Sequence, residues 1–397
     1  MNFDLFPIQL IPATKNSSIH LWNNTTKEII EGGFSRATPP GQASSGSTVF
    51  DRDGNLVELG ENIPDWSFKS GTPVIEMRPQ IENKFPEYKL EPVGSTRFTY
   101  TGLSVNGDVM TEDSSTGFHR LQYGFIPSFS LNTQYVYGVY VKNWSENRNL
   151  QMSISNGSTG DIVTRIFNKN GTSTGSINVG PNWSVASDGL YDLGNGNFLI
   201  WATGQTSAGT SHAIRLSLIS NIISIYTGDG ESSIEVVSFQ AQVGSVMSGI
   251  IPGTLTRGSN SFSFTDLVTK GVTSVNGFSV LIDLQNFRYN TVHFPVYFKN
   301  GTTNIFTILS NSPTTLFLRA VGNIINIANI PTIVTVSGGI LTAYQGSTVI
   351  VTAAITNNEI TSVVFENNNS SSFDIKRLYF TPIVLTEAES RSILNNL

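Results

Sequence analysis

Residues 292–309 read VHFPVYFKNGTTNIFTIL, and this stretch decides the fold class. Two short runs of β-branched and aromatic residues, 292–298 and 305–309, lie on either side of the pair Asn300-Gly301. Asn-Gly is favoured in the two-residue turn of a β-hairpin, because both residues tolerate positive φ angles. We therefore expect two antiparallel strands joined by this turn.

The same pattern repeats along most of the chain. Further runs of β-branched and aromatic residues occupy 135–141, 198–202, 234–239 and 333–336. Between such runs stand more Asn-Gly pairs, which begin at Asn106, Asn156, Asn170, Asn195 and Asn276. Short strands with tight turns are typical of antiparallel sandwiches, so we expect an all-β protein built of jelly rolls.

Helical periodicity is nearly absent until the C-terminus. There Thr386 can cap a helix, and Glu389, three residues later, can complete a capping box. Ile393 and Leu394 would give this helix an apolar face. We expect a short helix over 386–396 that packs on the last sheet.

The strand runs divide the chain into three zones. Residues 1–90 hold eight of the 16 prolines and a Ser/Gly-rich loop at 41–48, which predicts an extended N-terminal arm with few strands. Residues 91–256 form a first run of strands, and residues 257–397 form a second run that ends in the helix. Each run has the length of one jelly-roll sandwich.

Charge and hydropathy exclude several classes of partner. The net charge is -6, and the 23 Lys and Arg residues are scattered, whereas a nucleic-acid surface needs clustered basic residues. No stretch of about 18 apolar residues is present, so we expect no membrane insertion. The opening MNFDLFPIQLIP lacks the basic start of a secretory signal, which predicts synthesis in a cytoplasm without export by that route.

Residues that bind metals and cofactors are sparse. The chain has no Cys, which excludes disulfides, thiolate ligands and Cys nucleophiles. Residues 51–55 begin like a calcium loop, but the glycine comes two positions too early and no Glu stands at position 12 of the loop. The four histidines do not pair at ligand spacing. We expect a hairpin turn at 51–55, no metal site and no cofactor.

Four segments resemble a recurrent module of tailed-bacteriophage tail and virion proteins. In the order of the family, they lie at 34–38 with 51–56 and 62–64, at 73–83, at 239–257 and at 377–389. The third segment is the most specific and reads FQAQVG over 239–244 and IIPGT over 250–254. The resemblance spans about 34–397 and leaves the first 33 residues outside it.

Members of this family carry an arm, a carbohydrate-binding-like jelly roll and often a concanavalin-like sandwich. The resemblance implies a structural, non-enzymatic virion protein, a fibre or decoration on the phage head or tail, whose sandwiches can adhere to host-surface polysaccharide. By analogy with phage fibres, it also implies a homotrimer. Residues 1–33 are the expected attachment to other capsid or tail proteins, and the apolar stretch 324–336 is an expected subunit interface.

One strand departs from the family. Members often carry Gly-Trp-Tyr-Arg in the first jelly roll, where this chain has Asn197 and Leu199 at the Trp and Arg positions. The resemblance therefore carries no sugar-binding role over to these two positions.

Sugar binding needs an exposed aromatic face together with amide or carboxylate groups. Trp144 and Trp183 are the candidate carbohydrate-binding residues, because polar turn residues flank both and place them at expected loop tips. The alternative is that each indole covers one end of a sandwich. Trp66 and Trp201 are expected to pack inside the protein.

Catalytic residues are not expected. The chain has no nucleophile elbow, P-loop or dinucleotide fingerprint. Most acidic residues stand beside turns, and the two in strands, Glu235 and Asp283, are expected to face water. The turn-side acidic residues are Asp108, Glu112, Asp113, Asp188, Asp192, Asp229 and Glu231. Two alternatives stay open: a purely structural capsid or tail component without glycan binding, and a polysaccharide depolymerase that uses two carboxylates.

Overall fold

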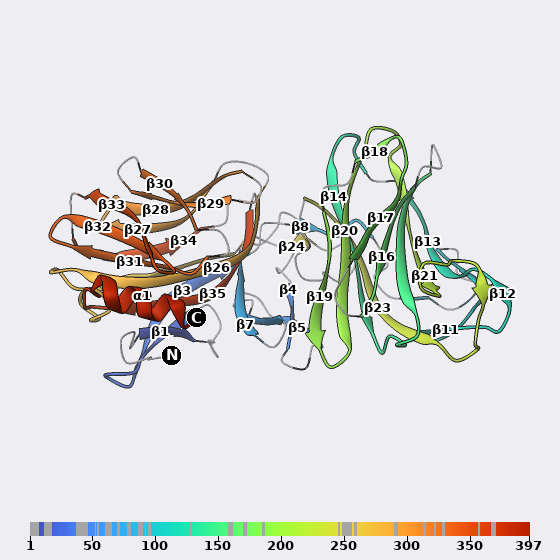
Figure 1. Cartoon of the computed structure of the whole chain (residues 1–397), viewed down its shortest axis with the longest axis horizontal. Helices are drawn as coiled ribbons and strands as arrows, with labels where there is room; N and C mark the ends of the chain where they lie inside the picture. Colours follow the sequence, from blue (N-terminus) through green and yellow to red (C-terminus); the bar gives the residue numbers. More distant parts are fainter. Residues whose placement is uncertain are drawn as a thin grey trace.

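The protein is known from a computed structural model and is almost entirely β-structure, which confirms the expected fold class. Two lobes lie side by side, and the one helix of the described residues, α1 (Glu387–Asn395), lies on the lobe that also contains the first described strands (Figure 1). The structure describes residues 8–11, 18–36, 47–51, 53, 55–59, 66–69, 72–77, 81–85, 90–91, 93, 97–127, 129–157, 162–169, 173–184, 187–244, 247, 256–257, 260–289, 293–312, 315–320, 323–327, 330–355, 358–366 and 371–397.

The first lobe is a sandwich of two antiparallel sheets. One sheet has the order β10 (Leu103–Asn106), β11 (Val109–Glu112), β23 (Ser233–Val243), β14 (Gln134–Lys142), β20 (Asn197–Thr206) and β18 (Trp183–Ser184), with β19 (Asp188–Gly194) also paired to β20. The other has the order β17 (Ser173–Val179), β16 (Ile162–Phe167), β15 (Asn149–Asn156), β21 (Ser211–Ile219), β13 (His119–Pro127) and β9 (Phe98–Thr101). A two-stranded ribbon of β12 (Thr116–Gly117) and β22 (Tyr226–Thr227) lies at its outer end (Figure 1).

The core of this sandwich is aromatic. Alternate residues of β14 and β20 point inward, and Tyr135, Tyr137 and Phe239 pack with Phe98 and Tyr123 between the sheets. Large rings remove much apolar surface from water for each ordered residue, which stabilises a sandwich of short strands.

A hairpin from the N-terminal zone covers the outside of this first lobe. The strands β4 (Ser47–Phe50) and β5 (Leu56–Leu59) pair with each other, which confirms the expected turn at 51–55. Phe50 packs edge-to-face on Tyr140 and joins Leu199 in a second, smaller core. Asn197 donates a hydrogen bond of 2.9 Å to the carbonyl of Asp53. Both positions that differ from the phage family therefore lie beneath this hairpin.

The second lobe is one sheet that folds over on itself. Its strand order is β30 (Asn323–Asn326), β29 (Thr315–Ala320), β28 (Thr303–Ser312), β27 (His293–Asn300), β34 (Ser362–Phe365), β25 (Asn260–Phe264), β3 (Glu28–Arg36), β2 (Ser18–Asn23), β1 (Ile8–Ile11), β35 (Ser371–Thr381), β26 (Phe278–Tyr289), β31 (Thr332–Ser337), β32 (Ile340–Gln345) and β33 (Thr348–Ala354). Strand β7 (Thr72–Met77) pairs with β35, and β6 (Trp66–Lys69) pairs with β7. Residues from both halves of this path share one apolar core, so the halves form the two layers of the second sandwich.

The expected extended arm is wrong for most of the described N-terminal residues. Strand β1 pairs with β2 and β35, and β3 pairs with β25, so residues 8–36 are strands inside the second sandwich. Pairing between the two ends of a chain leaves no local pattern in the sequence, which is why an arm was expected there. Residues 1–7 and 12–17 of the expected attachment segment lie outside the described residues.

The junction between the lobes is built from β7, β8 (Ile81–Glu82) and β24 (Thr256–Arg257). Strand β8 pairs with β24, which brings together the residues beside the two expected zone boundaries. Asn83 follows β8 and is fully buried; its side chain accepts hydrogen bonds from the backbone N–H groups of Phe85 and Ala241. These bonds hold the segment that leaves the second sandwich against β23 of the first sandwich. The boundaries at 90 and 256 stay predictions.

The turn at 195–196 and the C-terminal helix are placed as expected. Asn195 and Gly196 have φ angles of 53° and 77° and form the tight turn between β19 and β20. Helix α1 (Glu387–Asn395) has Thr386 as its N-cap, with the complete capping box to Glu389, and it packs on β31 and β32. In the described part of the chain, no helix has the length and apolar content needed to cross a membrane.

Candidate functional site

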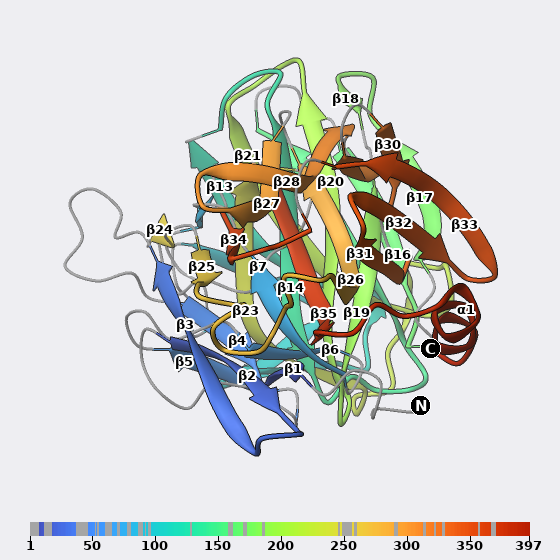
Figure 2. The same ribbon diagram turned by 90° about the vertical axis from the view of Figure 1, so that its left-hand side faces the viewer.

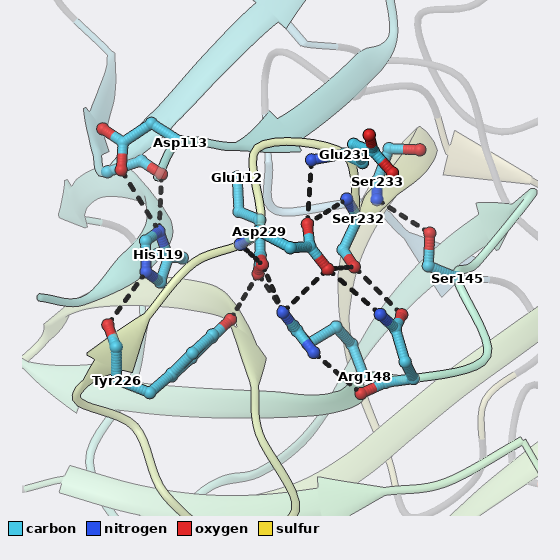
Figure 3. Close-up of polar contacts among 12 residues, drawn as sticks. Glu112, Asp113, His119, Ser145, Arg148, Tyr226, Asp229, Glu231, Ser232 and Ser233 are labelled. Atoms are coloured by element: carbon cyan, nitrogen blue, oxygen red, sulfur yellow. Dashed lines mark hydrogen bonds and ion pairs between the residues drawn. The ribbon is translucent and has the colours of Figure 1, made fainter. Parts of the chain in front are cut away.

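Polar side chains gather at the outer end of the first sandwich, far from the second lobe. They come from the end of β11, the loop 143–148, the start of β13 and the segment 226–233 that joins β22 to β23 (Figure 3). These segments are distant in sequence, but antiparallel pairing of β11 and β14 with β23 brings their ends together. We call the group of Glu112, Arg148, Tyr226, Asp229 and Ser232 the acid–arginine cluster.

Glu112 is the centre of the cluster, and its side chain is fully buried. Its Oε1 accepts hydrogen bonds from Nη2 of Arg148 at 2.5 Å and from the backbone N–H of Asp229 at 2.8 Å. Its Oε2 accepts from Nε of Arg148 at 2.9 Å and from the Tyr226 hydroxyl at 2.5 Å. A buried carboxylate is tolerated only when it is paired and hydrogen-bonded, and four donors meet that requirement here.

Arg148 joins two carboxylates. Besides its two hydrogen bonds to Glu112, its Nη2 donates to Oδ2 of Asp229 at 2.9 Å. Its guanidinium carbon lies 5.0 Å from the centre of the Tyr226 ring, a favourable cation–π distance. Hydrogen bonds with Glu112 raise the pKa of Arg148 above its ordinary value, despite partial desolvation. Arg148 is therefore a permanent cation that fixes the relative position of β11 and the loop before β15.

Asp229 holds the turn that leads into β23. Its Oδ1 accepts from the backbone N–H groups of Glu231 and Ser232, and its Oδ2 accepts from Nδ2 of Asn147. Desolvation pushes the pKa of Asp229 upward, but the hydrogen bonds from Ser232 and Glu231 outweigh it and bring the pKa well below its usual range. The carboxylate thus stays ionised near neutral pH and keeps the turn closed.

His119 supports the cluster from the side of β13. Its Nδ1 lies 2.8 Å from the carbonyl oxygen of Gly102, and its Nε2 lies 3.3 Å from that of Tyr226. The imidazole packs against the Tyr226 ring with 4.7 Å between centres. At Gly228 an added Cβ would stand 1.9 Å from the carbonyl oxygen of Asp113, so only glycine allows these two loops to approach.

The cluster is arranged to hold loops rather than to transfer protons. Burial, followed by the hydrogen bond to Glu112, raises the pKa of the Tyr226 hydroxyl, which keeps this phenol a donor at neutral pH. Both oxygens of Glu112 already accept hydrogen bonds from the protein. The groups of this cluster therefore fix three chain segments in one arrangement.

A solvent-facing surface surrounds the cluster, and we call it the rim. It combines carboxylates and amides with an aliphatic turn in which Ile222 is 65% exposed. Mutual backbone hydrogen bonds between Ser220 and Ile223 close this turn, and Asn149 donates to the carbonyl of Asn221. The exposed residues of the rim are Asp113, Glu146, Asn147, Asn221, Ile222, Ile223, Ile225 and Glu231.

The expected exposure of the two candidate tryptophans is wrong. Trp144 is 1% exposed, donates through Nε1 to the carbonyl of Arg148, and packs edge-to-face on Phe198. Trp183 is 6% exposed and packs on His212. The two rings lie at opposite ends of the sandwich. Trp144 follows the end of β14, whereas Trp183 pairs with Thr206 of β20, next to the residue of β20 that pairs with the start of β14. Neither indole has a ring face open to solvent, and a role of these residues in glycan binding stays a prediction.

Three further expectations can be compared with the structure. Asp283 does not face water, because its side chain is fully buried and accepts from Nη1 of Arg377 at 2.8 Å. Much of the expected interface at 324–336 belongs to the chain's own interior, since Ile333, Val334 and Val336 are fully buried. Among the described residues, no group of three or more His, Asp or Glu side chains is placed to hold a metal ion.

The acid–arginine cluster was missed because its members looked like separate turn residues. Glu112 and Asp229 each stand beside a turn in the sequence, and nothing local connects them to Arg148. The available signal was the position of Glu112 at the end of a strand beside a glycine-rich acidic turn at 229–231. Long-range strand pairing supplies the missing partner.

No family model matches the chain, and no curated protein matches it. Among solved structures, the binding domain of botulinum neurotoxin DC, in complex with rat synaptotagmin II, aligns with 38% of this chain at 14% identity and a TM-score of 0.27. The alignment spans 45% of that neurotoxin chain, less than half of its length.

Two other structures align over more of the chain. Trypanosoma rangeli sialidase is 8% identical over 98% of this chain and 83% of its own, with a TM-score of 0.27. Domains LG4-5 of the mouse laminin alpha1 chain are 10% identical over 74% of this chain and 90% of their own, with a TM-score of 0.18. Scores this low carry no conclusion about the activity of this protein.

Proposed function

We propose that the chain is a structural, non-enzymatic protein of a tailed-bacteriophage particle, and that it displays its two β-sandwiches for adhesion to host-surface polysaccharide. The observation that carries the adhesive part is the rim. It places amide, carboxylate and aliphatic groups next to one another, and this is the chemistry that recognises the hydroxyls and the C–H faces of sugars. The acid–arginine cluster beneath it keeps the loops in place, so little ordering is required when a ligand binds.

The four segments that resemble phage virion proteins support the structural part. The second segment contacts the third, and it pairs with the strand that carries the start of the fourth, although 158 to 300 residues separate the paired positions. Ile75 in the second segment pairs with Ile375 beside the fourth, and Asn83 bonds to Ala241 in the third. Segments that contact one another form one structural unit, which fits a module retained as a whole.

Adhesion through such a protein depends on several copies. A single sugar contact is weak, and a homotrimer on a particle would convert several weak contacts into avidity. Residues 1–33 remain the proposed attachment to other capsid or tail proteins. Because residues 18–33 are strands of the second sandwich, we place any such attachment on that lobe.

Two measurements test the proposal. Immunogold labelling of phage particles with an antibody against this chain should decorate the head or the tail, and unlabelled particles would contradict a virion role. The purified protein should bind extracted host polysaccharide, and binding should disappear after periodate oxidation of the sugar diols. Labelled particles without any glycan binding would favour the purely structural alternative, and new reducing ends in the polysaccharide would favour a depolymerase.

A further inference from the structure

The second sandwich has a polar row across the outer face of one layer. Antiparallel register places residues directly opposite each other on the same face. The row on the inner face consists of buried apolar residues, Phe34, Phe262, Phe365, Val296, Ile308 and Leu318. The adjacent row on the outer face consists of Gly33, Ser263, Val364, Tyr297, Thr307 and Arg319. Of the strands that carry these rows, β3, β25, β34, β27 and β28 follow one another in Figure 2.

Small residues at one end of the outer row leave a groove of about 280 Å³. Gly33, Ser261 and Ser263 lie on β3 and β25 and line its floor, and Val364 and Glu366 stand at its side. A Cβ added at Gly33 would meet no atom within 4 Å. The groove is therefore open because residue 33 has no side chain, and a larger residue there would fill it without a clash. We call this the Gly33 groove.

An aromatic ring extends the groove along the same row. Tyr297 pairs with Val364 and is half-buried, and the ammonium of Lys299 lies 4.9 Å from the centre of its ring. Burial, followed by the negative charge of Glu366, raises the pKa of Tyr297, which places that carboxylate within electrostatic range of the phenol. Hydroxyl, carboxylate and aliphatic groups thus line the groove, and the Tyr297 ring lies beside it on the same face of the sheet.

We propose that the Gly33 groove binds one ring of a neutral hexose in a host-surface polysaccharide. The inference rests on the proposed adhesive function and assigns it a second site, on the other lobe from the rim. Serine hydroxyls and the Glu366 carboxylate would bond to sugar hydroxyls, and Val364 with Tyr297 would contact the C–H face of the ring. Ligand pockets for drug-sized molecules begin at about 300 Å³, so this groove suits one ring. The carboxylate disfavours phosphate and acidic sugars through like-charge repulsion.

The groove can be closed by one substitution that has a matched control. Gly33→Val adds a branched side chain that strands tolerate well, into open space. Ala354→Val places a branched side chain at an exposed strand position of β33, away from both the groove and the rim. Glu366→Gln keeps the shape of the wall and removes its charge. Thermal unfolding of all three full-length variants establishes that each is folded.

Binding is measured by saturation-transfer difference NMR with the methyl glycosides of glucose, galactose and mannose, and with N-acetylneuraminic acid as the acidic probe. We expect at least one neutral glycoside to bind in the millimolar range and the acidic probe to bind at least tenfold more weakly. Gly33→Val should weaken neutral binding at least tenfold and Glu366→Gln several-fold, whereas Ala354→Val should leave it unchanged.

Equal neutral binding by the wild type, Gly33→Val and Glu366→Gln would overturn the groove and leave the adhesive function to the rim. Failure of the wild type to bind any neutral glycoside, or tighter binding of the acidic probe, would also overturn the groove. The adhesive proposal itself fails only when extracted host polysaccharide is not bound either. Where Gly33→Val does not fold, Glu366→Gln alone decides the result.

Discussion

The side-chain oxygen of Asn83 accepts a hydrogen bond of 3.1 Å from the backbone N–H of Ala241, which lies 158 positions later in the chain. The same oxygen accepts from the N–H of Phe85, and the N–H of Lys84 donates to the carbonyl of Ala241. Residues 83–85 therefore add to the edge of β23. One buried amide side chain thus secures the segment that links the two sandwiches.

Asn83→Ala should destabilise this junction. The substitution leaves the buried N–H groups of Ala241 and Phe85 without their acceptor, and unpaired buried groups cost about 1–3 kcal/mol each. We expect a loss of at least about 2 kcal/mol in the free energy of unfolding, measured by urea denaturation. Asn24→Ala is the control, since Asn24 accepts from Lys27 in an exposed turn, and it should change stability by less than about 0.5 kcal/mol. Equal effects of the two substitutions would contradict the role of Asn83.

Glu112→Gln should destabilise the first sandwich strongly. It leaves Arg148, which is only 10% exposed, without its main charge partner, and breaking a buried pair costs about 3–5 kcal/mol. The matched control is Glu387→Gln, which breaks the exposed pair with Arg391 on α1 and should cost less than about 0.5 kcal/mol. The free energy of unfolding of both variants is measured by guanidinium denaturation monitored by tryptophan fluorescence. A cost below about 1 kcal/mol for Glu112→Gln would mean that the cluster does not hold the loops.

The first sandwich should lose stability in mild acid through His212. This residue is buried and stacks on Phe129. Its Nδ1 forms a hydrogen bond of 2.6 Å with the Tyr137 hydroxyl. Desolvation lowers the pKa of His212 to about 4, against a smaller upward effect of the Gly209 backbone. The unfolded chain binds the proton more tightly, so this stability is complete above about pH 6.5 and is lost as the pH falls toward 4.

The size of this effect is up to about 3 kcal/mol, from a difference of about 2.5 pKa units. His212→Gln keeps an acceptor for Tyr137 but does not titrate. The difference in melting temperature between wild type and variant should therefore shrink, or reverse in favour of the variant, between pH 6.5 and 4. A difference that stays constant over this range would show that His212 does not contribute.

Trp144→Ala should lower the free energy of unfolding without weakening polysaccharide binding by the molecules that remain folded. Removal of a fully packed indole costs about 3–5 kcal/mol, and the variant also leaves the carbonyl of Arg148 without its donor. We expect polysaccharide binding per folded molecule to match the wild type, with the folded fraction measured by circular dichroism in the same samples. Weaker binding by a variant of unchanged stability would instead restore Trp144 as a sugar platform.

The sequence predicted those features that depend on neighbouring residues. The turn at Asn195-Gly196 follows from the φ angles that these two residues accept, and the helix cap follows from the spacing of Thr386 and Glu389. The turn at 300–301 was placed one position early, because Asn300 pairs with Thr303 and the turn is made by Gly301 and Thr302. All-β architecture follows from repetition of such local patterns.

The features that were missed depend on distant pairing. Glu112 and Arg148 are 36 residues apart, and strand order alone brings them together. Composition around Trp144 and Trp183 indicated polar loops, yet the rings turn inward because the sandwich core accepts them at both ends. The groove at Gly33 depends on β3, β25 and β34, which are more than 90 residues apart from one another in the chain, so no stretch of sequence contains it.

The pairing of β1 with β35 also sets the order in which the protein can be completed during translation. Strand β1 leaves the ribosome long before its partner strand β35 at 371–381. The two sheets of the first sandwich lie within 98–243. This sandwich can therefore fold while β1 and β3 still lack their later partner strands. A nascent chain therefore carries unpaired strand edges for most of its synthesis, and a product truncated before 371 would keep such an edge and associate with its neighbours.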